Sequence, residues 1–208
     1  MSRPGKIVCV GRNYREHAAE LGNAVPERPL LFLKPPSAVI GDGETIVLPA
    51  ASRRVEHEGE IGVVVGARLA HGDERAARAA VAGIVCVNDV TARDLQHADG
   101  QWTRAKGFDT FCPLGPRVLE VGPAFDLAGL EVRCRVNGVE RQHGRAADLV
   151  FGIPAILAFI SGVMTLEPGD VVATGTPAGV GPLVDGDVVE VEIPGVGVLK
   201  NLVRAATG

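Results

Sequence analysis

The chain has 208 residues, of which 46% are hydrophobic, and its 25 acidic and 21 basic side chains give a formal net charge of −4 at pH 7. This length is enough to bury a core without disulfide bonds, and the lack of any run of Lys or Arg argues against nucleic acid as a partner. The four cysteines are widely spaced with no Cys-x-x-Cys pair, which is typical of separate thiols in a reducing, cytoplasmic compartment.

Short apolar runs alternate with turn-forming residues in the first half of the chain. With 27 glycines and 14 prolines, the composition predicts many turns and no long-helix bundle. The first apolar run, at residues 7–10, is too short for a signal peptide. The pattern predicts strands at residues 6–11, 45–48, 58–66 and 82–88, helices at 13–21 and 73–81, an apolar run at 30–33, and a turn into a short helix at 89–95.

The second half is richer in strands. Asn137-Gly138 separates two polar–apolar segments, 130–136 and 139–142, and therefore predicts a β-hairpin with a type I′ turn. A helix is expected over residues 154–164, with Pro154 in its first turn. Further strands are predicted at residues 170–174, 187–193 and 198–203.

The apolar stretch at residues 149–166 barely reaches the ~20 residues that a membrane span needs, and it contains Gly and Pro. We therefore interpret it as a buried helix and expect no membrane association. A regular βαβ alternation is missing from the whole chain, which argues against a doubly wound sheet. We expect one compact α+β domain over residues 1–208, mainly β with a few short helices.

Glu58, Glu60 and Asp89 form the strongest candidate site. Residues two apart on a strand point to the same face, so Glu58 and Glu60 would lie together. Asp89 follows a buried apolar run directly, where an uncompensated carboxylate is costly. The structural alternatives are a solvated strand face for the two glutamates and a helix N-cap for Asp89. If the three carboxylates converge, they offer an all-oxygen site that suits Mg²⁺, Mn²⁺ or Ca²⁺.

His17 and Glu20 are three residues apart on a predicted helix and so share a face. A carboxylate beside an imidazole can fix its tautomer and raise its basicity, although a surface helix pair is the alternative. No serine or cysteine stands in a nucleophile elbow, which favours an activated water as nucleophile. Lys106 is either a surface lysine or, if it lies near a metal, a group that stabilises an enolate or a carboxylate.

The Gly-rich segment at residues 174–182 follows a predicted strand. It lacks the Gly-Lys-Ser/Thr of a P-loop and the spacing of a dinucleotide fingerprint, so a phosphate-binding role is weak. Its backbone N–H groups could instead bind a substrate carboxylate.

Five segments in this order resemble the fumarylacetoacetate hydrolase superfamily, and most closely its short acylpyruvate hydrolases and oxaloacetate decarboxylases. The resemblance runs from about residue 7 to residue 203. Two differences are present: Gly107 follows Lys106 where the family often has Ser, and residues 144–147 lack a common Asn-Thr. The segments are Gly11-Arg12-Asn13-Tyr14, Leu31-Phe32-Leu33-Lys34-Pro35, Glu58-Gly59-Glu60, Asn88-Asp89-Val90-Thr91-Ala92-Arg93-Asp94 and Thr174-Gly175-Thr176-Pro177-Ala178-Gly179-Val180-Gly181.

The resemblance implies a mixed β-sandwich roll, a homodimer, and Mg²⁺ or Mn²⁺ bound by Glu58, Glu60 and Asp89. It also implies that His17 and Glu20, on a mobile lid at residues 12–25, activate water, and that Lys106 is catalytic. The positions that it implies for substrate binding are Arg12, Arg93, Gln96, Gly175 and Thr176.

The expected reaction is hydrolysis of the C–C bond of an acylpyruvate, such as fumarylpyruvate or acetylpyruvate, to pyruvate and a carboxylic acid. Decarboxylation of oxaloacetate would use the same enolate. One alternative is an isomerase, tautomerase or hydratase acting on a 2-hydroxy-dienoate or enol oxaloacetate. Another is a non-catalytic metal-binding module, which would have no need of Lys106, the His17/Glu20 pair and the Gly-rich loop together.

Overall fold

A computed structural model describes residues 3–20 and 22–206. Its central layer is a seven-stranded sheet in the order β2-β1-β12-β6-β7-β9-β3. Strands β1, β6, β7 and β12 are buried along almost their whole length, which explains their continuous runs of Val, Ile and Cys. The strands of this sheet are β1 (Ile7–Gly11), β2 (Leu30–Lys34), β3 (Val39–Ile40), β6 (Gly59–Val65), β7 (Val81–Asn88), β9 (Cys112–Glu120) and β12 (Val171–Ala173).

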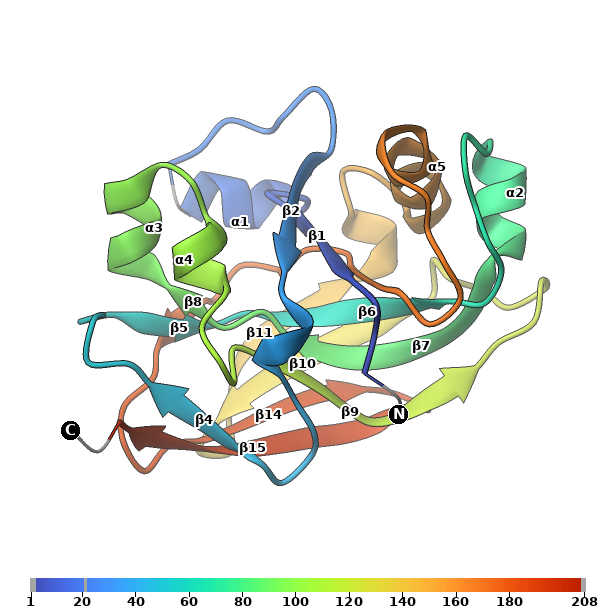
Figure 1. Cartoon of the computed structure of the whole chain (residues 1–208). Coiled ribbons are helices and arrows are strands. Elements are labelled where there is room, and N and C mark those ends of the chain that lie inside the picture. The colour runs from blue at the N-terminus through green and yellow to red at the C-terminus, as the bar shows by residue number, and fades with distance from the viewer. Residues whose placement is uncertain (1–2, 21, 207–208) are drawn as a thin grey trace.

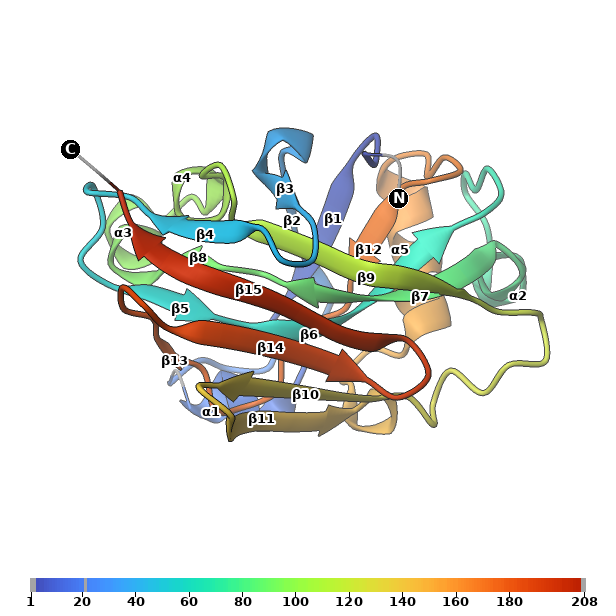
Figure 2. The ribbon, with the colours of Figure 1, turned by 90° about the horizontal axis from the view of Figure 1, so that it is seen from below.

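A five-stranded sheet, in the order β11-β10-β14-β15-β4, packs against one face of this layer (Figure 2). Buried and half-exposed residues alternate along β10 and β14, because only one face of this sheet meets the core. The larger buried cluster, mainly Val, Ile and Leu, joins the two sheets and also includes residues of α2 (Glu74–Ala79) and α5 (Ile153–Val163). A smaller second cluster is formed by residues of β1, β7, β9 and β12. The strands are β4 (Thr45–Leu48), β10 (Glu131–Val136), β11 (Val139–Arg145), β14 (Val188–Ile193) and β15 (Gly197–Ala205).

The helices cover the opposite face of the central sheet in two groups (Figure 1). Helices α1 (Arg15–Glu20), α3 (Arg93–Asp99) and α4 (Thr103–Lys106) lie at one end, and α2 (Glu74–Ala79) packs against α5 (Ile153–Val163) at the other. Two 3₁₀ turns and a small sheet, in the order β13-β5-β8, complete the described fold. Their bounds are Pro36–Ala38 and Ala146–Asp148 for the turns, and β5 (Val55–His57), β8 (Thr91–Ala92) and β13 (Gly181–Pro182) for the strands.

The predicted mainly β fold of two curled sheets with short helices is confirmed. The hairpin is also confirmed: Asn137 and Gly138 have φ angles of 53° and 77°, as a type I′ turn requires. Helices α2 and α5 lie within two residues of their predicted bounds, and Asp73 caps α2 by accepting a hydrogen bond from the Ala76 N–H at 2.8 Å. Among the described residues, no helix has both the length and the apolar character of a membrane span.

One expectation was wrong in detail, and one structural alternative is excluded. The strand predicted to start at Glu58 starts at Gly59, and Glu58 lies in a one-residue break between β5 and β6. Asp89 is not a helix cap, because the N-cap position of α3 is Ala92. Strand β9 was not predicted, since its central Gly115-Pro116 is a typical strand breaker. Residue 21, inside the predicted helix and lid, lies outside the described residues.

Candidate active site

Strand pairing brings Glu58, Glu60 and Asp89 together at the end of the central sheet. Strands β6 and β7 are antiparallel, with Gly59 opposite Asn88, so the residues that flank this pair become neighbours. The Asp89 N–H donates to the Glu58 carbonyl at 2.8 Å, and the Glu58 N–H donates to Asn88 Oδ1 at 3.0 Å. Each carboxylate offers an oxygen that lies within 4.8 Å of the other two.

The glycine of Glu58-Gly59-Glu60 is required by close packing between the two sheets. A Cβ at Gly59 would lie 2.9 Å from the Cβ of Cys134 on β10. Without that Cβ, the backbone of the segment sits directly against the second sheet, and both glutamates are held on a rigid element.

The three carboxylates fit a hard divalent cation. All donor atoms are oxygens, and the three side chains are almost fully buried. Glu60 forms no ion pair with any Lys or Arg in the described part of the chain, and its Oε2 accepts only the Gly175 N–H, at 2.8 Å. Burial, reinforced by Asp89 and Glu58, raises the pKa of Glu60 well above its ordinary value. A buried carboxylate in this position is stabilised by a bound cation.

Lys106 and Lys34 neutralise the negative charge of the other two carboxylates, Glu58 and Asp89. Lys106 Nζ donates to Glu58 Oε2 at 2.9 Å and to Asp89 Oδ2 at 2.6 Å, and Lys34 Nζ donates to Asp89 Oδ1 at 2.5 Å. Burial alone would raise the pKa of Glu58, but the charges of Lys106 and Arg93 outweigh it and hold this pKa far below its usual range. The charges of Asp89 and Glu58 likewise raise the pKa of Lys106 against the effect of burial. The two carboxylates therefore favour the cationic form of Lys106.

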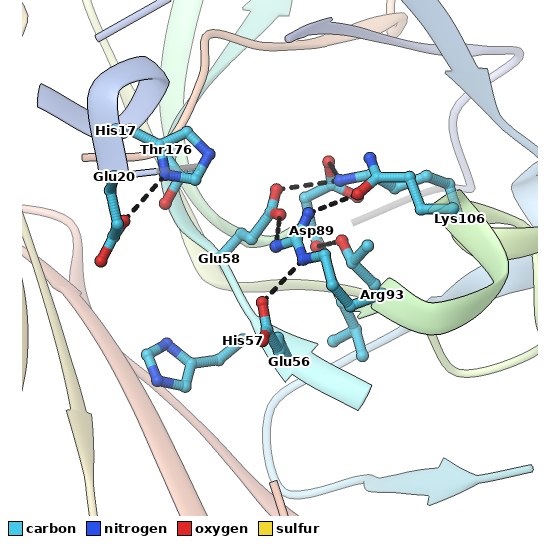
Figure 3. A network of polar contacts seen from close by, with 12 residues as sticks. His17, Glu20, Glu56, His57, Glu58, Asp89, Arg93, Lys106 and Thr176 are labelled. Carbon is cyan, nitrogen blue, oxygen red and sulfur yellow. Dashed lines mark hydrogen bonds and ion pairs between the residues drawn. The ribbon is translucent and has the colours of Figure 1, made fainter. Parts of the chain in front are cut away.

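Arg93 lies on the other side of Glu58 (Figure 3). It donates to Glu58 Oε1 at 2.5 Å, to Glu56 Oε2 at 2.7 Å and to Gln96 Oε1 at 2.5 Å. The Nε, Nη1 and Nη2 groups of Arg93 thus each donate to a partner within the protein. Its positive charge helps to orient the Glu58 carboxylate.

The His17/Glu20 pair forms as predicted, and it joins α1 to the Gly-rich loop. His17 Nδ1 lies 3.2 Å from Glu20 Oε2 (Figure 3). Glu20 Oε1 accepts the Gly179 N–H at 3.0 Å. The carboxylate favours the tautomer with hydrogen on Nδ1, which leaves a lone pair on Nε2. The geometry therefore gives His17 the arrangement of a general base.

The root of the predicted lid is tied to the core by Asn13. Its side-chain amide donates to the carbonyl of Thr174 at 2.8 Å and of Phe151 at 3.1 Å, and its Oδ1 accepts the Phe151 N–H at 2.9 Å. Three hydrogen bonds therefore hold the start of the predicted lid to the core.

A single cavity of about 380 Å³ unites most of the predicted residues, and its volume suits a small organic acid. Gly175 and Glu20 are not part of its lining: Gly175 positions Glu60, and Glu20 positions His17. The predicted residues that line the cavity are Arg12, His17, Glu58, Glu60, Asp89, Arg93, Gln96, Lys106 and Thr176.

Arg12 lies at the cavity in a rare conformation. Its φ angle of 57° is in the left-handed region, which a non-glycine residue seldom adopts, and its guanidinium carbon lies 6.0 Å from the centroid of the Trp102 ring. Within residues 3–20 and 22–206 it pairs with no carboxylate. It is therefore the cavity cation best able to meet a second carboxylate of a ligand.

Sequence reasoning missed the supporting residues Lys34, Glu56 and Trp102. Lys34 ends an apolar run, and Glu56 stands two residues before Glu58, so both could have been recognised as buried partners from their spacing. Nothing in the sequence indicates that Trp102 lies at the site, because its contact with Gly11 depends on where the loop before α4 lies. A Cβ at Gly11 would lie 2.7 Å from the Trp102 ring.

The sequence and fold match known proteins over nearly the whole chain. The family model described as "Fumarylacetoacetate (FAA) hydrolase C-terminal" matches residues 6–204. The human protein named oxaloacetate tautomerase FAHD2A, mitochondrial, is 42% identical over 212 residues, which cover 98% of this chain and 68% of that protein. An uncharacterized protein of Archaeoglobus fulgidus is 52% identical over 198 residues, covering 95% and 78% of the two chains.

Among solved structures, 5-carboxymethyl-2-hydroxymuconate delta-isomerase from Mycobacterium smegmatis superposes with a TM-score of 0.89. It is 45% identical in sequence, and the match covers 99% of this chain and 81% of that one.

Proposed function

The chain belongs to the fumarylacetoacetate hydrolase family, and from that premise we propose that it is a divalent-metal-dependent hydrolase that cleaves the C–C bond of an acylpyruvate. The products would be pyruvate and a carboxylic acid. One observation carries this proposal: a carboxylate triad, a compensating lysine and a histidine with its own carboxylate partner all meet at one cavity.

Glu58, Glu60 and Asp89 are the residues that would hold Mg²⁺ or Mn²⁺. When bound, the ion would supply a Lewis acid and a template for the carboxylate and 2-oxo oxygen of the substrate.

The protein's own groups would carry the protons and the charge. His17 Nε2 takes a proton from water as the water oxygen forms a bond to the distal acyl carbon. The bond from that carbon to C3 then breaks, and its electron pair passes into the enolate of pyruvate. The His17 imidazolium returns a proton to C3, which gives pyruvate and the free acid. Lys106 places a fixed positive charge beside the developing enolate.

The same groups would also accept oxaloacetate. Loss of CO₂ from it leaves the same pyruvate enolate, so Lys106 would stabilise the same charge. Decarboxylation needs no attacking water and would depend less on His17.

Oxaloacetate tautomerisation is the second candidate, and the names of relatives favour it. The rat and human proteins named oxaloacetate tautomerase are 40% and 42% identical to this chain. Such a reaction moves one proton between C3 and the enol oxygen and adds no water. His17 and Lys106 could perform this transfer, so the substrate assay must distinguish the two reactions.

A paired assay tests the proposal. Purified protein with Mg²⁺ or Mn²⁺ is given fumarylpyruvate, acetylpyruvate and oxaloacetate; pyruvate is measured with lactate dehydrogenase, and enol absorbance is followed separately. We expect pyruvate from at least one acylpyruvate. A change in the enol absorbance of oxaloacetate with no pyruvate from any acylpyruvate would replace hydrolysis by tautomerisation.

A further inference from the structure

The cavity that holds the three carboxylates of the proposed metal site also contains hydrogen-bond donors with no partner in the protein. Lys106 and Arg93 line this cavity, but both are already paired with carboxylates of the site. Arg12 and His97 line it as well, and within residues 3–20 and 22–206 neither side chain forms a hydrogen bond or an ion pair. These two groups are therefore available to a ligand.

Two aromatic rings connect the three carboxylates with Arg12. Lys106 Nζ, which binds two of the carboxylates, lies 4.9 Å from the centroid of the Phe32 ring. That ring meets Trp102 edge to face, with 5.2 Å between the centroids, and the guanidinium carbon of Arg12 lies 6.0 Å from the centroid of the Trp102 ring. All four side chains line the cavity. Its wall thus leads from a charged end through an apolar middle to a second cation.

Helix α3 carries His97 toward the same end of the cavity. Arg93, in the first turn of the helix, binds Glu58, whereas His97 lies one turn further on, about 6 Å along the helix axis. The helix ends at Gly100, which also lines the cavity, and Trp102 follows directly after the next residue. His97 therefore lies at the end of the cavity that Trp102 forms, away from the three carboxylates.

This end of the cavity is held in a fixed shape. Gly11 lets the Trp102 ring approach the backbone next to Arg12, because a Cβ at Gly11 would lie 2.7 Å from that ring. Helices α3 and α4 pack together (Figure 1), and Arg104 joins them by donating to both carboxylate oxygens of Asp99, at 2.7 and 2.5 Å. A guanidinium beside an aromatic ring still presents N–H groups that match the two oxygens of a carboxylate.

The distribution of donors along the cavity indicates the shape of its ligand. A ligand whose 2-oxo acid end lies at Lys106 would extend its carbon chain along the Phe32 and Trp102 rings. The end of that chain then meets Arg12 and His97, which both donate hydrogen bonds. A terminal methyl group would leave these donors without a partner, whereas a terminal carboxylate would accept from both.

We propose that Arg12 and His97 form a carboxylate-binding subsite, and that the substrate is an acylpyruvate whose acyl group itself ends in a carboxylate. The inference rests on the proposed function, since it names the substrate of the same cavity. It favours fumarylpyruvate, which has this second carboxylate, over acetylpyruvate, which ends in a methyl group.

Two 2-oxo acids that cannot be hydrolysed test the subsite without turnover. 2-Oxoheptanedioate and 2-oxoheptanoate have the same chain length and differ only in a terminal carboxylate, and neither has the second carbonyl group that hydrolysis needs. Calorimetry of wild-type protein with Mg²⁺ should give a Kd at least about tenfold lower for 2-oxoheptanedioate, because a charge-assisted pair forms only with that acid.

Variants at the subsite should remove this preference. In Arg12→Gln, the two Kd values should come within about threefold of each other, while the Kd of 2-oxoheptanoate stays near the wild-type value and shows that the variant is folded. His97→Leu removes a neutral donor and should reduce the preference about threefold. Arg141→Gln, the same change as at Arg12 but at an exposed position on β11 outside this cavity, is the matched control and should keep the wild-type preference.

Three results would count against the inference. Equal Kd values for the two acids in wild-type protein would overturn it, whatever the variants do. An equal loss of affinity for both acids in Arg12→Gln would assign Arg12 to the 2-oxo acid end of the ligand instead. An unchanged preference in His97→Leu would remove His97 from the subsite.

The proposed hydrolysis can fail separately from the subsite. If wild-type protein prefers 2-oxoheptanedioate but releases no pyruvate from fumarylpyruvate, the hydrolysis is refuted and the carboxylate-binding subsite stands.

Discussion

His17 is the residue on which the proposed hydrolysis would depend most. Its Nδ1 is held by Glu20 and its ring lines the cavity, so its other nitrogen is available to take a proton. We expect His17→Ala to lower kcat for acylpyruvate hydrolysis by ~10²-fold or more. His143→Ala is a suitable control, because His143 is exposed on β11 and outside the cavity. Near-normal turnover in His17→Ala would remove it from the mechanism.

Lys106 matters for the stability of the fold, because its positive charge neutralises two buried carboxylates at once. Lys106→Met would leave Glu58 and Asp89 with one cation fewer in a buried site. Loss of one partner from such a group costs about 3–5 kcal/mol, so we expect a clear fall in the urea midpoint of metal-free protein.

Added Mg²⁺ should recover part of that lost stability in Lys106→Met, because the ion supplies the missing positive charge. Lys200→Met, which removes a lysine paired with Glu190 at the exposed surface, is the control and should change stability little. Equal urea midpoints for the two variants would mean that the charge of Lys106 is not needed to stabilise the carboxylates.

At the level of elements, the short helix α1 carries His17 and Glu20, the proposed catalytic pair, and its start is held more firmly than its end. Asn13 fixes the root with three hydrogen bonds, whereas Glu20 makes a single bond to the Gly179 N–H. Elements with few buried bonds open most readily. We predict that oxalate with Mg²⁺ slows amide hydrogen exchange in a peptide covering residues 12–25, while one covering α2 keeps its rate. Unchanged exchange in both would exclude a lid that closes over ligand.

The elements with strong local patterns were predictable from the sequence. The Asn-Gly hairpin, the Pro-started helix α5 and the buried strands β1 and β7 each follow from neighbouring residues alone. The break between strands at Glu58 could not be predicted from the sequence. It exists because β5 pairs with β8 and β13 in a separate small sheet.

At the scale of the whole molecule, the site is made by residues far apart in the chain. Glu60 and Gly175 are hydrogen-bonded across 115 positions, and Lys34 reaches Asp89 across 55. The three carboxylates of the site could be predicted from the sequence, because acidic side chains next to buried strands need positive charge nearby. The cations that neutralise these carboxylates could be predicted only in part, because Lys34 ends an apolar run in the sequence whereas Arg93 is brought to Glu58 by tertiary packing.

The assembly is a further prediction at this scale. Strand β2 forms an edge of the central sheet and exposes Leu30 and Leu33, an arrangement that a second copy could cover. We propose a homodimer and expect light scattering to give a mass near twice the 21.6 kDa of one chain. A mass equal to one chain at micromolar concentration would refute it.

Glu58, Glu60 and Asp89 are proposed to hold one divalent ion that the reaction requires. The most direct measurement is a Mn²⁺ titration of EDTA-treated protein, followed by calorimetry and by pyruvate release in parallel. We predict one ion bound per chain, activity that rises in step with occupancy, and loss of both in Glu60→Gln. Full activity in the metal-free protein, or wild-type Mn²⁺ affinity in Glu60→Gln, would contradict the claim.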